Sequence, residues 1–360
     1  MDKDAIVQRV WDLCNKQQEQ EQGQGAPCEF GAMVSSAGLH YLAKTDTHKF
    51  KDPEIDKFRG RDDRGARVYI TNDIVIAIDV FLENGVAHKS VAAQMLLHIL
   101  LIEFTKRKEK AFFLSLSDYK EYRHLSDDKT AREQLQRDLT LWFYTAISFD
   151  EKWIKKKKLP FTEMRILGSN PIIKNGAARI NFTDEFYDYL LQRCKQIQQF
   201  PLALLQLSAQ NDKYAYMLGY QLSYLERVQA GDANQGHEKV STLLKECNFP
   251  TLEETHRHPE QIIEPFLTAL EKLKDIGYLL NYELIDKDGK KIVQDKLRKD
   301  AKIRAAYDKF ITLYLDFTAA TPDQSNLIER RDKQREKTEK VQEKAKVKAA
   351  ANAIKKKKKA

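Results

Sequence analysis

The polar side chains between residues 129 and 140 have the types and spacing that suit contact with duplex DNA. They are Lys129, Thr130, Arg132, Glu133, Gln136, Arg137 and Thr140. Arginine and glutamine carry hydrogen-bonding groups that match base edges in the major groove, and lysine neutralises phosphate charge. The first turn of a helix adds backbone amides that also favour phosphate. We therefore predict that this segment is a helix whose polar face contacts DNA.

A second cationic cluster consists of four consecutive lysines, Lys155, Lys156, Lys157 and Lys158. The lysines follow an extended stretch, residues 148–154, and precede Leu159-Pro160 and a predicted strand, residues 162–167. A basic loop beside a DNA-reading helix is placed to neutralise the phosphate backbone. We predict this role for the four lysines.

A plain solvated surface is the alternative interpretation of the polar helix face. Every amphipathic helix has a polar face, and for residues 129–147 alone the solvated surface is the simpler reading. The context favours DNA, because a capped short helix precedes this segment and the lysine loop follows it.

A weaker set of candidate DNA contacts lies in the second half of the chain. It consists of Arg257, Lys287, Lys290 and Lys291. The polar face of the neighbouring predicted helix, residues 260–276, carries Glu264, Glu271 and Asp275, which would repel phosphates. We expect this half to touch DNA through its loops, and a purely structural or dimerising role is the alternative.

The sequence contains no recognisable pattern of catalytic or cofactor-binding residues. No G-x-x-x-x-G-K-[ST] phosphate-binding loop occurs, since residues 60–65 (GRDDRG) lack its lysine and hydroxyl. His256-Arg257-His258 has the spacing of the metal pair of rolling-circle nucleases, but Arg257 replaces the hydrophobic residue of that motif. The four cysteines are scattered, without C-x-x-C spacing. We expect no enzyme activity, no cofactor and no metal.

The helix that carries the first candidate site has one continuous apolar stripe. Its members are Ala131, Leu135, Leu139, Trp142 and Ala146. Before it we predict a helix at residues 90–105, a strand at 112–116 and a short helix at 119–125 whose N-cap is Ser117. With the hairpin around the lysine loop, this order is typical of a winged helix. Asn175-Gly176 predicts a further hairpin, and residues 186–197 a further helix.

The same order recurs later in the chain. We predict helices at residues 212–228, 239–247 and 260–276, a hairpin at 279–293 that turns at Asp288-Gly289, and a last strand at 311–317. The predicted fold class is therefore α+β, mainly helical, with two tandem winged-helix domains at residues 66–198 and 199–320. Residues 1–65 form an N-terminal extension with a polar linker, and residues 321–360 a basic tail.

Charge is distributed unevenly along the chain. Residues 329–360 contain 14 Lys or Arg against 5 Asp or Glu, whereas the whole chain has a formal net charge of +8. DNA binding by the body must therefore come from local clusters, and the tail is either a non-specific anchor on polyanions or a solubilising segment. The chain begins without a signal peptide, and the apolar helix at residues 92–104 is too short to span a bilayer, so we expect a cytoplasmic protein without membrane contact.

Several segments together resemble the iteron-binding plasmid replication initiators, a family built of tandem winged helices. The resemblance covers roughly residues 111–293: the segment 113–119 (FLSLSDY), residues 127–139, residues 179–183 (RINFT), residues 200–205 (FPLALL) and Pro265-Phe266. It implies binding to repeated origin sequences, cooperation with a host initiator and the replicative helicase, and a monomer–homodimer equilibrium with autorepression. The acidic side chains at Glu264, Glu271 and Asp275 depart from the groove contacts that the family's second domain makes.

Two other functions fit parts of the same pattern. A winged-helix transcription regulator would use the same helix without a role in replication, and direct repeats beside the gene would favour initiation over regulation. A nicking enzyme would cut supercoiled origin DNA in the presence of a divalent metal, and we expect no such nick.

Overall fold

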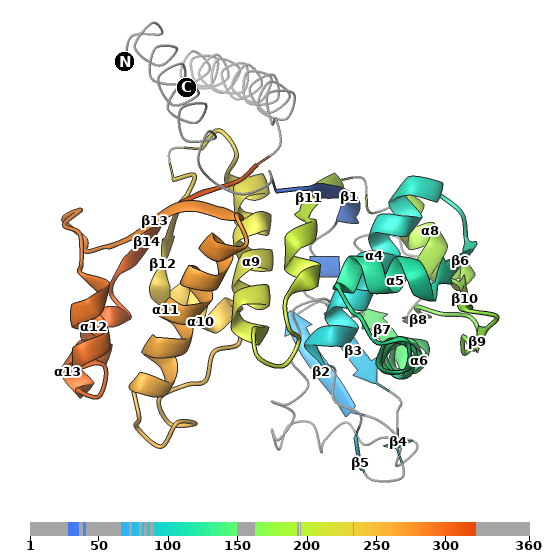
Figure 1. Cartoon of the computed structure of the whole chain (residues 1–360), viewed down its shortest axis with the longest axis horizontal. Coiled ribbons are helices and arrows are strands. Elements are labelled where there is room, and N and C mark those ends of the chain that lie inside the picture. The colour runs from blue at the N-terminus through green and yellow to red at the C-terminus, as the bar shows by residue number, and fades with distance from the viewer. Residues whose placement is uncertain are drawn as a thin grey trace, which may run out of the picture.

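The fold combines helices with small antiparallel sheets and is of the α+β class (Figure 1). The computed structural model describes residues 28–35, 39–40, 66–71, 74–78, 81–82, 85–86, 90–149, 163–192, 194, 196–232 and 234–321. Two groups of elements with the same internal order account for most of these residues, and we call them the first unit and the second unit.

The first unit contains three helices and a three-stranded sheet. In chain order its elements are α4 (Val91–Arg107), β6 (Ala111–Ser115), α5 (Leu116–Arg123), α6 (Asp128–Tyr144), β9 (Ile173–Lys174) and β10 (Ala177–Asn181). The sheet is antiparallel with the order β6-β10-β9, so the last strand lies in the middle. Helix α8 (Asp184–Gln192) follows β10.

The second unit repeats this arrangement. Its elements are α9 (Lys213–Gln229), β12 (His237–Lys239), α10 (Val240–Glu246), α11 (Glu260–Asp275), β13 (Leu279–Ile285) and β14 (Tyr314–Ala319). The sheet order is β12-β14-β13, so again the strand before the short helix pairs with the last strand. Helices α12 (Gln294–Asp300) and α13 (Arg304–Phe310) lie between β13 and β14 in the chain.

A four-stranded antiparallel sheet is attached to the first unit. Its order is β2-β3-β7-β8, from β2 (Ala66–Thr71), β3 (Ile74–Ile78), β7 (Thr145–Phe149) and β8 (Glu163–Arg165). The short strands β4 (Phe81–Leu82) and β5 (Gly85–Val86) pair with each other. The hairpin predicted around the lysine loop exists, since β7 pairs with β8, but it belongs to this sheet and not to β6-β10-β9.

The apolar stripe predicted for α6 faces the core. Ala131, Leu135, Leu139 and Trp142 are fully buried, and the Trp142 indole donates to the backbone oxygen of Ala93 in α4 at 2.7 Å. The fifth member, Ala146, lies in β7, because the helix ends at Tyr144 and not at residue 147. Residues 145–149 (TAISF) are β-branched and aromatic enough to pair with β3.

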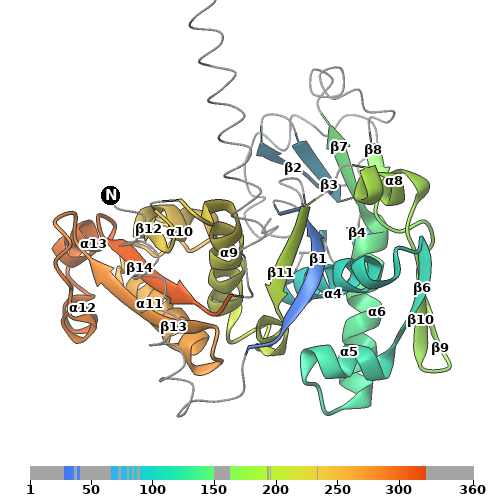
Figure 2. The ribbon, with the colours of Figure 1, turned by 90° about the horizontal axis from the view of Figure 1, so that it is seen from above.

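A two-stranded sheet joins the two units. Strand β1 (Phe30–Ser35) pairs antiparallel with β11 (Gln196–Pro201), and the 3-10 helix η2 (Leu202–Gln206) follows β11. Figure 2 shows this pair between α4 of the first unit and α9 of the second, and both helices contact it. The predicted boundary between residues 198 and 199 lies inside β11, and the division into two domains stays a prediction.

Buried hydrogen bonds cross the junction between the units. His98 Nδ1 of α4 lies 2.5 Å from the Tyr216 hydroxyl of α9. Arg123 of α5 donates through Nη1 to the backbone oxygens of Leu205 and Leu207, the latter at 3.3 Å. Because these groups are buried, they hold the first unit against the segment that leads into the second.

Three local predictions were wrong in detail. The N-cap of α5 is Ser115, whose hydroxyl accepts from the Asp118 amide at 2.9 Å, so the helix begins before Ser117. The predicted helix at residues 186–197 ends at Gln192, and residues 196–201 form β11. The predicted hairpin at residues 279–293 has only one bridge, Ile285–Lys291, after its turn. Strand β13 instead pairs along its length with β14.

Candidate nucleic-acid interface

The N-terminus of α6 is capped by a carboxylate. Asp127 accepts a hydrogen bond from the backbone amide of Thr130 at 2.6 Å, and hydrogen bonding to the Thr130 side chain and to this amide lowers the pKa of Asp127. Asp128 forms an ion pair with Lys120 of α5. The Thr130 amide is therefore already paired, and the predicted attraction of phosphate to this helix end is offset by two acidic side chains.

The exposed surface of α6 retains several of the predicted cations. Lys129 and Arg137 have side chains that are 84% and 64% exposed, and Arg132, Thr130 and Glu133 are also exposed. Lys129 Nζ lies 4.0 Å from Glu133 Oε1, a loose exposed pair. We call these exposed side chains of α6 the α6 strip, which consists of Lys129, Thr130, Arg132, Glu133 and Arg137.

Gln136 and Thr140, predicted to contact DNA, are partly buried and form hydrogen bonds within the protein. Gln136 Nε2 donates to the Pro171 oxygen at 2.7 Å, and its Oε1 accepts from the Ile173 amide at 3.2 Å. The Thr140 hydroxyl donates to the Gln136 oxygen at 2.8 Å and lies 3.4 Å from Asn170 Oδ1. Both polar ends of the Gln136 amide are thus used to fix the segment before β9 against α6.

The hairpin that completes the β6-β10-β9 sheet is β9–β10, whereas the strands on either side of the lysine loop, β7 and β8, belong to the four-stranded sheet. Asn175 and Gly176 form its turn with φ of 50° and 74°, as the Asn-Gly pair predicted. Lys174 and Asn175 are exposed at this turn, beside Ile173 and its bond to Gln136. Lys174 is therefore a candidate DNA contact that the sequence analysis missed, although the Asn-Gly signal pointed to its hairpin.

The four-lysine loop falls outside the described residues, so Lys155, Lys156, Lys157 and Lys158 have no assigned place. The strands that flank the loop are described. Strand β7 follows directly from the C-terminal end of α6, and β8 pairs with it at Ala146–Arg165.

Arg137 of the α6 strip forms an ion pair with a buried carboxylate. Its Nε donates to Asp138 Oδ1 at 3.2 Å, and Asp138 is 1% exposed. Burial raises the pKa of Asp138 to about 6, while the positive charges of Arg137 and Arg123 oppose the rise. Tyr119 of α5 is also buried beside this group, and its pKa is raised mainly by burial and then by the Asp138 charge.

The predicted contacts of the second unit are spread over separate loops. Arg257 lies in a turn in which it and His256 both have positive φ, and its side chain is exposed. Lys287 and Lys290 are exposed around Gly289, where Asp286 organises the turn by accepting from the Lys290 amide at 2.9 Å. Lys291 forms an ion pair with Glu283. Three of these four cations therefore share the turn after β13, whereas Arg257 lies in a different turn.

The helix of the second unit that corresponds to α6 has an acidic exposed face. Glu264, Glu271 and Asp275 of α11 are all exposed, as the sequence predicted. Glu271 forms an ion pair with Arg298 of α12, with 2.8 Å between Glu271 Oε1 and Arg298 Nη2, and α12 contacts α11. Acidic charge and a neighbouring helix both oppose the entry of α11 into a DNA groove.

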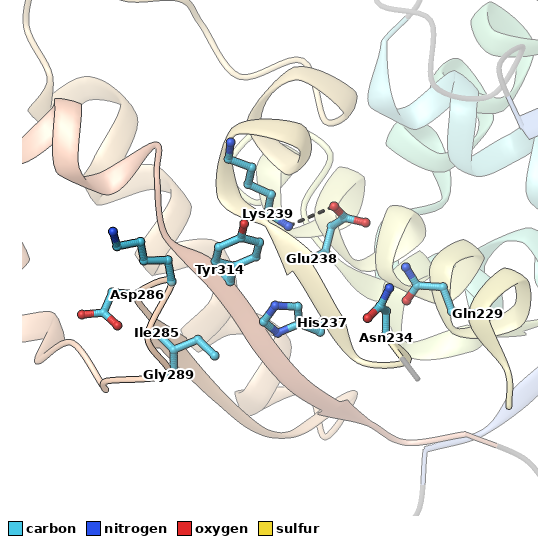
Figure 3. Close-up of a pocket in the computed structure, with 10 residues that line it drawn as sticks. Gln229, Asn234, His237, Glu238, Lys239, Ile285, Asp286, Gly289 and Tyr314 are labelled. Atoms are coloured by element: carbon cyan, nitrogen blue, oxygen red, sulfur yellow. Dashed lines mark hydrogen bonds between the residues drawn. The ribbon is translucent and has the colours of Figure 1, made fainter. Parts of the chain in front are cut away.

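A pocket of about 530 Å³ opens on the second unit between β12, β14 and the turn after β13 (Figure 3). The rings of His237 and Tyr314 stack with their centroids 4.8 Å apart. Lys239 and Lys287 line the pocket together with Glu238 and Asp286, so its charges cancel. Among the residues that the structure describes, no group of three His, Cys, Asp or Glu side chains is arranged to hold a metal ion. No described helix is both long and apolar enough to cross a membrane.

Comparisons with known proteins do not identify a family for this chain. No protein-family model and no curated protein matches the sequence. Among solved structures, the crystal structure of selenomethionine derivatives of domains 2 and 3 of RctB matches with a TM-score of 0.43 and 13% identity, over 80% of this chain and 100% of that one.

Proposed function

We propose that this chain binds double-stranded DNA through the α6 strip of its first unit, and that both units are winged helices. The observation that carries the proposal is the repeated topology. In each unit a strand, a short helix and a longer helix precede two further strands of the same three-stranded sheet, and the last of these strands pairs with the first. In a winged helix the longer helix enters the major groove, and in the first unit that helix is α6.

The exposed cations around α6 fit this role. Lys129, Arg132 and Arg137 extend along the helix, and Lys174 lies on the adjoining hairpin. Lysine and arginine at such positions neutralise phosphates, and arginine also pairs with guanine in the major groove. The site therefore consists of the α6 strip and the β9–β10 turn, without Gln136 and Thr140.

The finer proposal is that the chain binds origin repeats in the cytoplasm and initiates plasmid replication. Its partners are a host initiator and the replicative helicase. The chain exchanges between monomer and homodimer and also represses its own promoter. This finer proposal rests on the resemblance of residues 111–293 to the iteron-binding initiators. The chain acts here as a binding protein and not as an enzyme. A transcription regulator would use the same α6 strip, and direct repeats beside the gene distinguish the two.

A retardation assay tests the proposal. The probe is the duplex upstream of the gene, and a shuffled duplex of equal length and composition is the control. We expect tighter binding to the native probe, with affinity that falls as salt rises. The variant Arg132→Ala should weaken binding, whereas Glu185→Ala, which removes an exposed charge of α8, should not. Equal affinity for both duplexes, or no effect of Arg132→Ala, would overturn the proposal.

A further inference from the structure

Asp138 is a buried acidic residue directly beneath the α6 strip. Its side chain is 2% exposed, and its Oδ1 accepts from Arg137 Nε at 3.2 Å. Within the described part of the chain, its Oδ2 has no hydrogen-bond partner. One oxygen of this carboxylate therefore accepts a hydrogen bond from an exposed arginine, and the other forms no hydrogen bond with the described core residues.

Retaining a charge at this position is unfavourable for stability. Burial is the largest influence on the pKa of Asp138 and raises it to about 6, above its ordinary 3.8. The ionised groups that oppose this rise are Arg137 on the same helix and Arg123 on α5, and Arg123 is already bonded to Leu205 and Leu207. Tyr119 of α5 is the other ionisable neighbour. An amide or an apolar side chain would avoid the cost of the buried charge.

We propose that Asp138 is a positioning residue that holds the Arg137 guanidinium in the orientation in which it meets DNA. This inference rests on the proposed function. The Arg137 side chain is 64% exposed, so without a partner it would sample many rotamers. A carboxylate fixed in the helix core restrains the guanidinium at Nε and leaves its terminal nitrogens to donate to a phosphate or a base. The free energy lost to the buried charge is then balanced by a more ordered contact.

Protonation of Asp138 should release this restraint. A neutral carboxyl group binds a guanidinium more weakly than a carboxylate does, so Arg137 should be ordered above pH 6 and looser below it. The variant Asp138→Asn keeps the shape of the side chain and removes its charge at every pH. The matched control is Asp188→Asn, which removes an exposed charge of α8.

The first experiment needs no DNA. The Nε–H signal of Arg137 is followed by NMR in the full chain with ¹⁵N-labelled arginine, and it is assigned by its loss in Arg137→Lys. We expect Asp138→Asn to speed its exchange with water about fivefold relative to the other arginines at pH 7.5, because a neutral amide oxygen replaces the charged acceptor and weakens the hydrogen bond. The wild-type protection should decline between pH 7 and pH 5. Unchanged exchange in Asp138→Asn would overturn the inference, whatever the DNA result.

The second experiment measures affinity for the native upstream duplex between pH 5.5 and pH 8. Asp138→Asn should bind about threefold to tenfold more weakly at pH 7.5 and lack the wild-type pH step near 6. Removing a negative charge alone would favour DNA, so Asp188→Asn should bind equally or more tightly. The double variant Arg137→Ala/Asp138→Asn should bind no more weakly than Arg137→Ala.

The outcomes separate the two ideas. If Arg137→Ala weakens binding and Asp138→Asn leaves binding and its pH profile unchanged, the positioning role is wrong and the proposed function stands. If the exchange of Arg137 Nε–H responds as expected but no variant of the α6 strip changes DNA affinity, the restraint exists and the proposed function is wrong.

Discussion

The two units share an element order and a strand order, yet their corresponding helices present opposite charges. The exposed surface of α6 carries Lys129, Arg132 and Arg137, whereas that of α11 carries Glu264, Glu271 and Asp275. The core faces of both helices are apolar and buried, with Trp142 in one and Phe266 in the other. The comparison teaches that the buried stripe of a helix specifies the scaffold, while its exposed side specifies the partner, so topology alone does not assign DNA contact to both units.

The largest expected effect concerns the shared core. Trp142→Ala should lower the free energy of unfolding by about 3–5 kcal/mol, because it leaves a cavity between α4 and α6 and removes the bond to Ala93. Phe266→Ala should cost a similar amount, since the Phe266 side chain is equally buried. Chemical denaturation of both variants measures these losses. A loss below about 1 kcal/mol in one unit alone would break the structural equivalence of α6 and α11.

A smaller effect is the pH dependence of stability that Asp138 gives the first unit. The pKa of Asp138 is about 6 in the folded chain and near 3.8 unfolded, so between these values the folded state binds more protons. Stability should therefore fall as pH rises from about 4 to 7, by at most roughly 3 kcal/mol. Chemical denaturation of wild type and Asp138→Asn at pH 4.5 and 7.5 should show this loss of stability in the wild type alone. An equal change in the free energy of unfolding of Asp138→Asn between the two pH values would contradict the prediction.

DNA affinity should distinguish the exposed faces directly. Arg132→Ala in α6 should weaken binding to the native duplex by about 1–3 kcal/mol. The matched change in the second unit, Glu264→Ala, should leave affinity the same or slightly tighter, because it removes a charge that repels phosphate. Titration by fluorescence anisotropy measures both. Weaker binding by Glu264→Ala would mean that α11 also contacts DNA, and the contrast between the units would be lost.

The smallest expected effect tests the loops of the second unit. If Lys290 at the turn after β13 contacts a phosphate, Lys290→Ala should reduce the slope of log K against log salt by about 1 without changing sequence preference. Lys245→Ala on α10 removes the same charge at a site away from that turn and serves as the control. Equal slopes for wild type and Lys290→Ala would exclude this turn from the interface.

The sequence was informative where signals are local and uninformative where pairing is distant. The stripe of Ala131, Leu135, Leu139 and Trp142 predicted the buried face of α6 because helical spacing alone determines it. The Asn175-Gly176 turn was likewise predictable. The pairing partner of β6 was not predictable, because β10 is remote from it in the chain. For that reason the flanking hairpin was assigned to the lysine loop.

The hydrogen bonds of the candidate site residues were not predictable from the sequence, for a related reason. Residue type predicts that Gln136 is polar and near the surface, but its bonds to Pro171 and Ile173 depend on where the chain returns. The buried Asp138 was not singled out, although its position beside Leu139 on the core side of the helix was a local signal. Strand β1 was missed altogether, because residues 28–65 show no clear periodicity.

The pairing of β1 with β11 has a consequence for synthesis on the ribosome. Phe30 faces Pro201, so the edge of β1 has no partner until residues 196–201 have emerged. During that interval the helices of the first unit can form, while β1 presents unsatisfied backbone groups to other nascent chains. Pairing of β1 with β11 therefore comes late in synthesis and joins distant segments, the kind of step that slows folding.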